Sequence, residues 1–245
     1  MLIVTGRSLQ ADRLIDIYVG EVTPETTPFR VQQVLLGQLS DYFDSALKTD
    51  TFVEGKQGRL HFPEDNVSAW KVLLHWAFTR MLPHWFKSTA EGNLDDGTAM
   101  LLVDCWVLGD KYQIHAFQDE VMMEMLCWLV YSPGSCDVFK RGVELTSPGS
   151  KLRRLMAEGL EELYEDGYES SDLDQFDGMQ FLEDYVQAKR RRDDHVSQHL
   201  ATRFGCNGEV TLEAGPGGTW KEYMVGDKLP SRAWKWIEKW GIWGF

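Results

Sequence analysis

Every segment of this chain with strand character lies before residue 63, and only helical patterns follow. The expected strands are "LIDIYV" at 14–19, "FRV" at 29–31 and "RLHF" at 59–62. The first two are separated by the turn-rich "EVTPETTP", so we expect them to form a hairpin. Short helices are expected near 32–37 and 40–48. A few early strands followed by stacked helices predict the α+β class.

The later helices are predicted from apolar residues at helical spacing. Asn66, at the end of "PEDN", is the expected N-cap of the first of them. An insertion with Gly and Asp, about 81–97, precedes the second. The expected apolar faces are Val67, Trp70, Leu74 and Ala77, then Leu101, Cys105, Leu108 and Tyr112, and then Phe117, Val121, Met125 and Trp128.

The negative charge of the chain is concentrated in one stretch. The formal charge is −13 over 245 residues, yet eleven acidic residues and no Lys or Arg lie between Glu158 and Asp184. A net negative charge argues against a nucleic-acid surface or an anionic membrane as the main partner. The acidic stretch could bind a basic partner, but a solvated and partly mobile segment, at 164–178, is the favoured interpretation.

The remaining composition indicates a protein of a reducing compartment. The four cysteines, Cys105, Cys127, Cys136 and Cys206, form no CxxC pair, so we expect no structural disulfide. "MLIV" is too short for a signal-peptide core, and no apolar run approaches the ~18–20 residues of a membrane span. The expected location is cytoplasmic or nuclear, without secretion.

Six short motifs occur in an order and spacing that resemble the BTB/POZ domain, and the similarity is greatest to the type found in filamentous fungi. They are "YVG", "F-x-V" followed by "LL", "S-x-YF-x-x-AL", "F-x-E", "L-x-F-PED" and "VLGDKYQIHAFQDEVM". The resemblance covers about residues 12–131 and implies a short three-stranded sheet with a cluster of helices. We expect this segment to fold alone as a compact unit.

The resemblance also implies a function, because BTB domains are protein–protein interaction modules. Such domains self-associate or dock on a cullin scaffold so that the chain presents a client for ubiquitination. The resemblance places the cullin contact at Phe52 and Glu54 of "FVE", with Tyr42, Tyr131 and Pro133 as secondary contacts. A non-ubiquitin self-associating scaffold or a nuclear regulatory protein is the alternative.

Helical spacing separates the roles of two neighbouring aromatic residues. Phe43 shares a face with Leu39 and Leu47 and is expected in the core. Tyr42 lies about a hundred degrees around the helix, so we expect its ring at the rim of the partner surface with a wet hydroxyl group.

Dimerisation through the charged pocket of the family is not favoured by the residues present. Gln32 and Gln33 stand where the family often has His-Lys, and Leu14 stands where many members have an Asp. The fold does not depend on these positions, but the oligomeric state does.

No catalytic, cofactor or metal motif emerges, so we expect a protein that is not an enzyme. There is no GxSxG, Walker or GxGxxG motif. "GPGG" at 215–218 reads as a loop, and "DLDQFDG" at 172–178 departs from a calcium loop. His195 and His199 lie four apart, but no third metal ligand accompanies them.

The second half is predicted to hold a helical extension, 132–204, and a Gly- and Trp-rich tail, 205–245. "SPGSKLRRLMAEGL" at 147–160 resembles the helical region that follows the BTB domain in fungal relatives. "KRRR" at 189–192 is either a nuclear-import signal or the charged face of a helix over about 179–203. Trp234, Trp236, Trp240 and Trp243 form a stripe that docks on its own domain or anchors in a partner.

Overall fold

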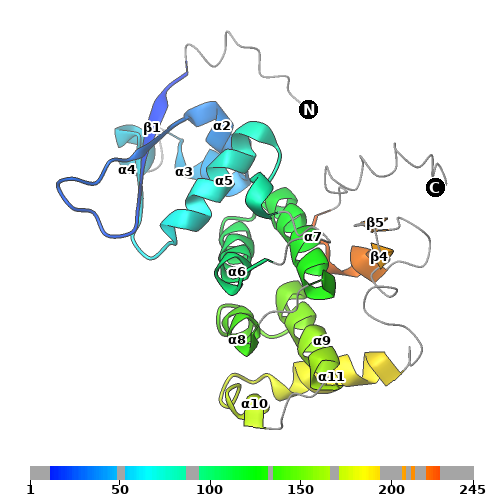
Figure 1. The fold of residues 1–245 in the computed structure, drawn as a ribbon. Coiled ribbons are helices and arrows are strands. Elements are labelled where there is room, and N and C mark those ends of the chain that lie inside the picture. The colour runs from blue at the N-terminus through cyan, green and yellow to red at the C-terminus, as the bar shows by residue number, and fades with distance from the viewer. Residues whose placement is uncertain are drawn as a thin grey trace.

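The computed structural model of this chain describes residues 12–48, 53–86, 94–131, 135–165, 171–193, 206–207, 211–212 and 219–226. Within them, the chain is α+β, with a small three-stranded sheet at one end and helices stacked below it (Figure 1). This confirms the predicted class.

The sheet has the strand order β2-β1-β3. Strand β1 (Leu14–Val19) pairs antiparallel with β2 (Phe29–Gln32), which confirms the hairpin, and parallel with β3 (Arg59–Phe62). The side chains of β1 and β3 alternate, because successive residues of a strand point to opposite faces. Ile15, Ile17, Val19, Leu60 and Phe62 are buried. A separate short antiparallel pair is formed by β4 (Cys206–Asn207) and β5 (Thr211–Leu212), so the expectation that all strands lie before residue 63 was wrong.

Most helices lie where the sequence places them. They are α2 (Gln33–Gly37), α3 (Asp41–Ala46), α4 (Val53–Gln57), α5 (Val67–Thr79), η1 (His84–Phe86), α6 (Asp96–Lys111), α7 (His115–Tyr131), α8 (Cys136–Glu144), α9 (Lys151–Glu165), α10 (Ser171–Asp174), α11 (Leu182–Asp193) and η2 (Thr219–Tyr223). Helices α4, α8 and α10 were not predicted. Asn66 caps α5 as expected, because its side-chain oxygen accepts the backbone N–H groups of Ser68 and Ala69.

Two of the sequence motifs meet at a single carboxylate. Asp65, in "PED", accepts hydrogen bonds from the Trp70 indole at 2.8 Å, the Tyr112 hydroxyl at 2.6 Å and the Lys111 ammonium at 2.7 Å. Burial, and then the bond to Asp65, raises the pKa of Tyr112 above its ordinary value. Asp65 therefore fastens the start of α5 to the end of α6.

Helix α7 is buried on every side, which the predicted amphipathic face did not anticipate. Phe117, Val121, Met125 and Trp128 are in the core as expected, but every residue from 117 to 129 is buried. Elements later in the chain cover the second face. A smaller correction concerns Val67, which is exposed because it lies in the first turn of α5.

Helices α8 and α9 supply part of this cover. The ring centroids of Trp128 and Phe139 are 5.6 Å apart, and Gly159 lies directly against the Leu129 side chain. Arg141 of α8 also forms an ion pair with Asp104 of α6, with 2.7 Å between Nη2 and Oδ1. One hydrophobic core thus continues across the boundary expected after residue 131.

The segment around η2 covers another part of α7. The Asp119 carboxylate accepts the backbone N–H groups of Val225 at 2.6 Å and Gly226 at 2.9 Å. Burial raises the pKa of Asp119, although these two N–H groups and His115 act in the opposite direction. Tyr223, two residues before Val225, is also fully buried.

The acidic stretch is docked where the structure describes it. The buried Phe176 stacks on Phe181 with ring centroids 4.7 Å apart. Arg153 is also buried; it donates to Asp184 at 2.5 Å and to the carbonyl oxygens of Val143, Thr146 and Met179. Within 171–178 the chain is thus packed through Phe176, residues 166–170 lie outside the described part, and the mobility of 164–178 stays a prediction.

Gly159→Ala tests the contact between α9 and α7. An added Cβ would lie 2.5 Å from Cδ1 of Leu129 and 2.8 Å from Cε1 of Phe139. Overpacking of this kind costs ~1–3 kcal/mol, so we expect the free energy of unfolding in urea to fall by that amount. Gly37→Ala is the control, because its nearest neighbour would be 3.5 Å away. Equal stabilities of both variants would contradict the packing.

Truncation tests whether residues 12–131 fold alone. A fragment ending at 131 leaves Trp128 and Leu129 without the cover of α8 and α9. Exposure of a large apolar side chain costs ~1.5–3 kcal/mol. We expect this fragment to melt below fragment 12–226 and to bind a hydrophobic dye. Identical melting temperatures would show that the extension adds no stability to the first part.

Candidate partner-binding groove

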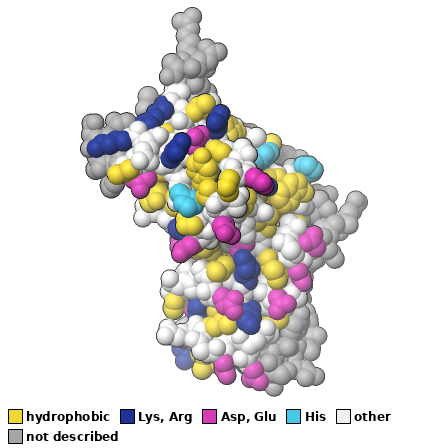
Figure 2. All heavy atoms as spheres, turned by 90° about the vertical axis from the view of Figure 1, so that its left-hand side faces the viewer, with side chains coloured by type: hydrophobic (Ala, Val, Ile, Leu, Met, Phe, Trp, Pro, Cys, Tyr) yellow, Lys and Arg dark blue, Asp and Glu magenta, His cyan; other side chains and the backbone are white. Residues whose placement is uncertain are grey.

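A groove of about 870 Å³ lies beside the sheet. Its lining comes from α3 and α4, from all four residues of β3, and from Tyr18 and the turn at 22–26. Its lining residues include Tyr42, Ala46, Val53, Glu54, Arg59 and His61. Figure 2 shows the face that carries the sheet: cationic side chains gather at its upper end, with hydrophobic and histidine side chains next to them.

The structure confirms the expected division between Tyr42 and Phe43. Phe43 is fully buried, whereas Tyr42 is 43% exposed and lines the groove. The two rings meet edge to face with centroids 5.2 Å apart, and Tyr42 also lies 5.0 Å from the Tyr112 ring. One side of Tyr42 is therefore held by the core while the rest remains available.

Helix α4 brings a second predicted residue to the same groove. Glu54 is exposed in its first turn, next to Val53, which is 62% exposed. Gly55 is buried so close to the preceding loop that a Cβ would lie 2.5 Å from the carbonyl oxygen of Lys48. Only glycine permits this approach, so the "FVEG" sequence fixes where Glu54 stands.

Arg13 holds the other end of α4. Its guanidinium donates to the carbonyl oxygens of Gly55 at 2.6 Å and Lys56 at 2.7 Å. These contacts satisfy terminal helix carbonyls, which have no partner within a helix. Sequence reasoning missed this role because the two segments are more than forty residues apart.

The remaining predicted contacts lie outside the described residues. This applies to Phe52, Pro133 and the tail residues Trp234, Trp236, Trp240 and Trp243. Tyr131 is the last residue of α7, and its side chain also lies outside the described part. The structure thus brings together Tyr42 and Glu54 only.

The positions of the family's charged pocket carry other contacts here. Leu14 is 53% exposed at the start of β1, and the Gln33 amide donates to the carbonyl oxygen of Leu47 at 3.3 Å. Asp12, two residues before Leu14, accepts the backbone N–H of Val34 at 2.7 Å, in the first turn of α2. Asp12 was not singled out in the sequence.

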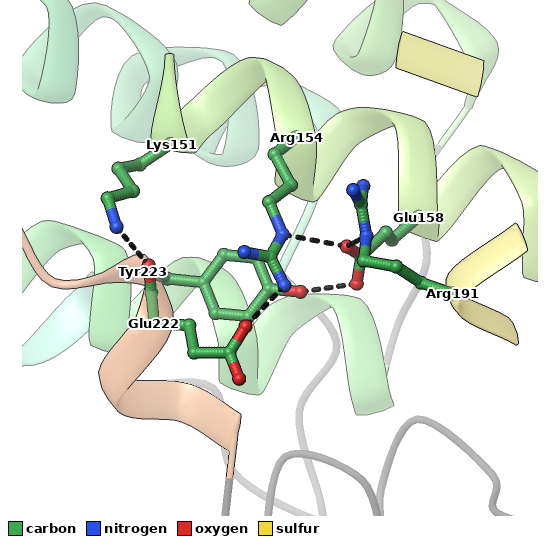
Figure 3. A network of polar contacts seen from close by, with 6 residues as sticks. All are labelled: Lys151, Arg154, Glu158, Arg191, Glu222 and Tyr223. Carbon is green, nitrogen blue, oxygen red and sulfur yellow. Dashed lines mark hydrogen bonds and ion pairs between the residues drawn. The ribbon is translucent and has the colours of Figure 1, made fainter. Parts of the chain in front are cut away.

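A second cluster of charged residues lies between α9, α11 and η2 (Figure 3). The Glu158 carboxylate, which is fully buried, accepts Arg154 at 2.9 Å, Arg191 at 2.7 Å and the Tyr223 hydroxyl. Arg154 also contacts Glu222 at 2.6 Å and lies over the Tyr223 ring. Because Glu158 is enclosed by these partners, the cluster joins three elements and offers no open site.

This cluster assigns a structural role to part of "KRRR". Arg191 faces Glu158, whereas Arg190 is exposed. Within the described residues, α11 covers 182–193 of the predicted helix 179–203; residues 194–203, with His195 and His199, lie outside the described part.

Among the described residues, no group of three or more His, Cys, Asp or Glu side chains could hold a metal ion. The described helices include none with the length and apolar character needed to cross a membrane. Cys105 and Cys127 are buried, and among the described cysteines Cys105, Cys127 and Cys136 take part in no disulfide.

No protein-family model matches this chain, and no curated protein is significantly similar to it.

Substitutions in and beside the Glu158 cluster should lower the free energy of unfolding at the positions that contact Glu158 and leave it unchanged at an exposed position. Removing one partner of a buried ion pair costs ~3–5 kcal/mol, so we expect Glu158→Gln to lower the free energy of unfolding by about 3 kcal/mol. Arg191→Gln should also destabilise, whereas Arg190→Gln, at an exposed position, should stay within ~0.5 kcal/mol of the wild type. Urea titrations measure all three. Equal effects of the two arginine variants would refute the assigned role of Arg191.

Proposed function

We propose that this chain is a protein–protein interaction adaptor of the BTB/POZ type, without catalytic activity, that docks on a cullin scaffold and recruits a client for ubiquitination. The observation that carries the proposal is the groove, which unites Tyr42 and Glu54 from two different helices. The six motifs predicted a partner surface at these same residues. A location in the cytoplasm or nucleus belongs to this proposal.

The chemistry of the groove suits a protein partner. Its lining offers the apolar surface of Tyr42, Ala46 and Val53 together with the carboxylate of the exposed Glu54. Aromatic side chains that are half-covered and rigid are favoured anchors at interfaces. A rim carboxylate contributes orientation and association rate more than affinity.

The contact between Asp65 and the two residues Lys111 and Tyr112 supports the resemblance independently. "PED" and "DKY" are two of the motif segments, and in the fold they are joined by hydrogen bonds of 2.6 and 2.7 Å. Motifs that meet in space have a structural reason to occur together in a family.

A self-associating scaffold, in the nucleus or the cytoplasm, is the second candidate. Leu14 is 53% exposed and Val34 is 37% exposed. The two residues lie on adjoining elements, because Leu14 of β1 pairs with Gln32 of β2 and Val34 follows Gln32 by two residues. Exposed aliphatic residues at adjoining elements are suited to a second copy of the chain. Sedimentation of the full chain distinguishes a dimer from a monomer.

Binding of a purified cullin amino-terminal domain to the immobilised full chain tests the adaptor. Loss of an aromatic anchor costs ~2 kcal/mol or more, about thirtyfold in affinity, so Tyr42→Ala and Phe52→Ala should weaken binding by this factor. Glu54→Ala should weaken it less than tenfold. Leu182→Ala, at a site that is 75% exposed on α11, should change nothing.

Melting temperatures of the same variants separate contact from core. A contact residue leaves the melting temperature unchanged, whereas a core residue lowers it. Absence of cullin binding at tens of micromolar would rule out the adaptor, and a dimer in sedimentation would then favour the scaffold.

A further inference from the structure

The floor of the groove is the outer edge of a β-sheet. Strand β3 pairs with β1 on one side only, because the strand order is β2-β1-β3. The groove is lined by each residue of β3, by residues of α3 and α4, and by Tyr18 and residues of the turn at 22–26. Helix α3 packs on the core through Phe43, whereas Tyr18 alternates with the buried Ile17 and Val19 and so points to the opposite face of the sheet. Among the described residues, no strand pairs with the other edge of β3.

The register identifies which backbone groups face the groove. The carbonyl oxygens of Gly58 and Phe62 accept the N–H groups of Asp16 and Gly20, each at 2.9 Å. Backbone groups alternate in direction along a strand. The carbonyl oxygen of Gly58 and the backbone N–H and C=O groups of Leu60 and Phe62 therefore point to β1. The backbone N–H and C=O groups of Arg59 and His61 point away from β1. Within the described part of the chain, no backbone group pairs with these outward groups.

We propose that the groove binds an extended segment of a partner protein, which adds to β3 as a fourth strand. The outward N–H and C=O groups of Arg59 and His61 provide up to four hydrogen bonds, and only another extended backbone offers matching donors and acceptors at this spacing. Addition of a strand to an open sheet edge is a general mode of peptide recognition. The inference rests on the proposed function, because it specifies the chemistry of what the interaction groove binds.

The residues on the two sides of the β3 edge determine which kinds of side chain the bound segment carries. In an added strand, alternate side chains point to opposite faces of the sheet. One set faces Tyr42, Ala46 and Val53 and is apolar. The other set lies beside the exposed side chains of Arg59 and His61, and for Arg59 no ion pair to a described residue is seen. Carboxylates at these positions complement the cation, so the segment alternates apolar and acidic residues.

The edge is also short, which sets the kind of interaction. Strand β3 has four residues, and short edges with charged side chains resist uncontrolled pairing between sheets. Such an edge recognises a short segment through its walls and not through the backbone alone. Reversible binding is expected, as for transient partners.

Selection of a displayed library of random seven-residue peptides on the immobilised full chain provides the probe. The selected peptides are synthesised, and their dissociation constants for wild type, His61→Pro and His61→Thr are measured by fluorescence anisotropy. Proline removes the outward N–H of residue 61 and obstructs an incoming strand, but the N–H that it removes does not bond to β1. Threonine keeps the N–H and suits a strand.

We expect peptides that alternate apolar and acidic residues. His61→Pro should weaken their binding at least tenfold, about 1.4 kcal/mol, and His61→Thr should stay within about threefold of the wild type. Because proline could disturb the sheet, amide hydrogen exchange of the wild-type chain provides a second measurement. The amides of Arg59 and His61 should exchange more slowly when the peptide is bound.

Three results would overturn the inference: no selected peptide, equal binding to His61→Pro, or no added protection of these two amides. Each is distinct from failure of the proposed function, which is decided by binding of the cullin domain and by sedimentation. Peptides that depend on Tyr42 but not on the N–H of residue 61 would retain the groove and reject the added strand.

Discussion

The complete burial of α7 is the constraint on which the rest of the structure depends. A helix with only one apolar face needs one layer of neighbours, but a helix buried from 117 to 129 needs cover on all sides. Helices α5 and α6 cannot supply this cover alone. Helices α8 and α9 and the segment around η2 complete it, and the buried Asp119 and Glu158 hold η2 against them. The second half of the chain is therefore part of the same core.

The groove exists because a different set of contacts fixes the opposite end of the molecule. Arg13 and the close approach of Gly55 hold α4 beside β3, while Phe43 holds α3 on the aromatic cluster with Trp70. Tyr42 and Glu54 are then displayed by helices whose inner residues, Phe43 and Gly55, are buried. Short helices of five or six residues would not hold these positions by themselves.

Local patterns in the sequence predicted the parts of the fold that depend on neighbours in the chain. The three strands of the sheet, the cap at Asn66 and the burial of Phe43 all follow from spacing and residue type over a few positions. Patterns of this range did not reveal the second buried face of α7, because its partners, such as Phe139 and Gly159, are distant in sequence. Helix α8 was missed although its apolar residues are at helical spacing, because only nine residues define it.

The candidate site was predictable to the same extent. Tyr42 and Glu54 were found from motifs, but the floor of the groove was not, since the direction of a backbone N–H on β3 depends on which strand it pairs with. The parallel pairing of Asp16 with Arg59 determines the direction of these N–H groups. The residue types in β3 do not indicate this pairing. Arg13 and Asp12 were missed for a related reason: each bonds to backbone groups, which leave no trace in side-chain patterns.

The continuous core has a consequence for how an adaptor of this shape would work. In a chain of separate domains, a partner on one domain leaves the orientation of the other free. Here the ion pair of Arg141 with Asp104 and the contact of Gly159 with Leu129 join the sheet-bearing part to α8 and α9. A partner held in the groove would therefore be bound to the same continuous core that includes α8 and α9, and not to a separately hinged domain.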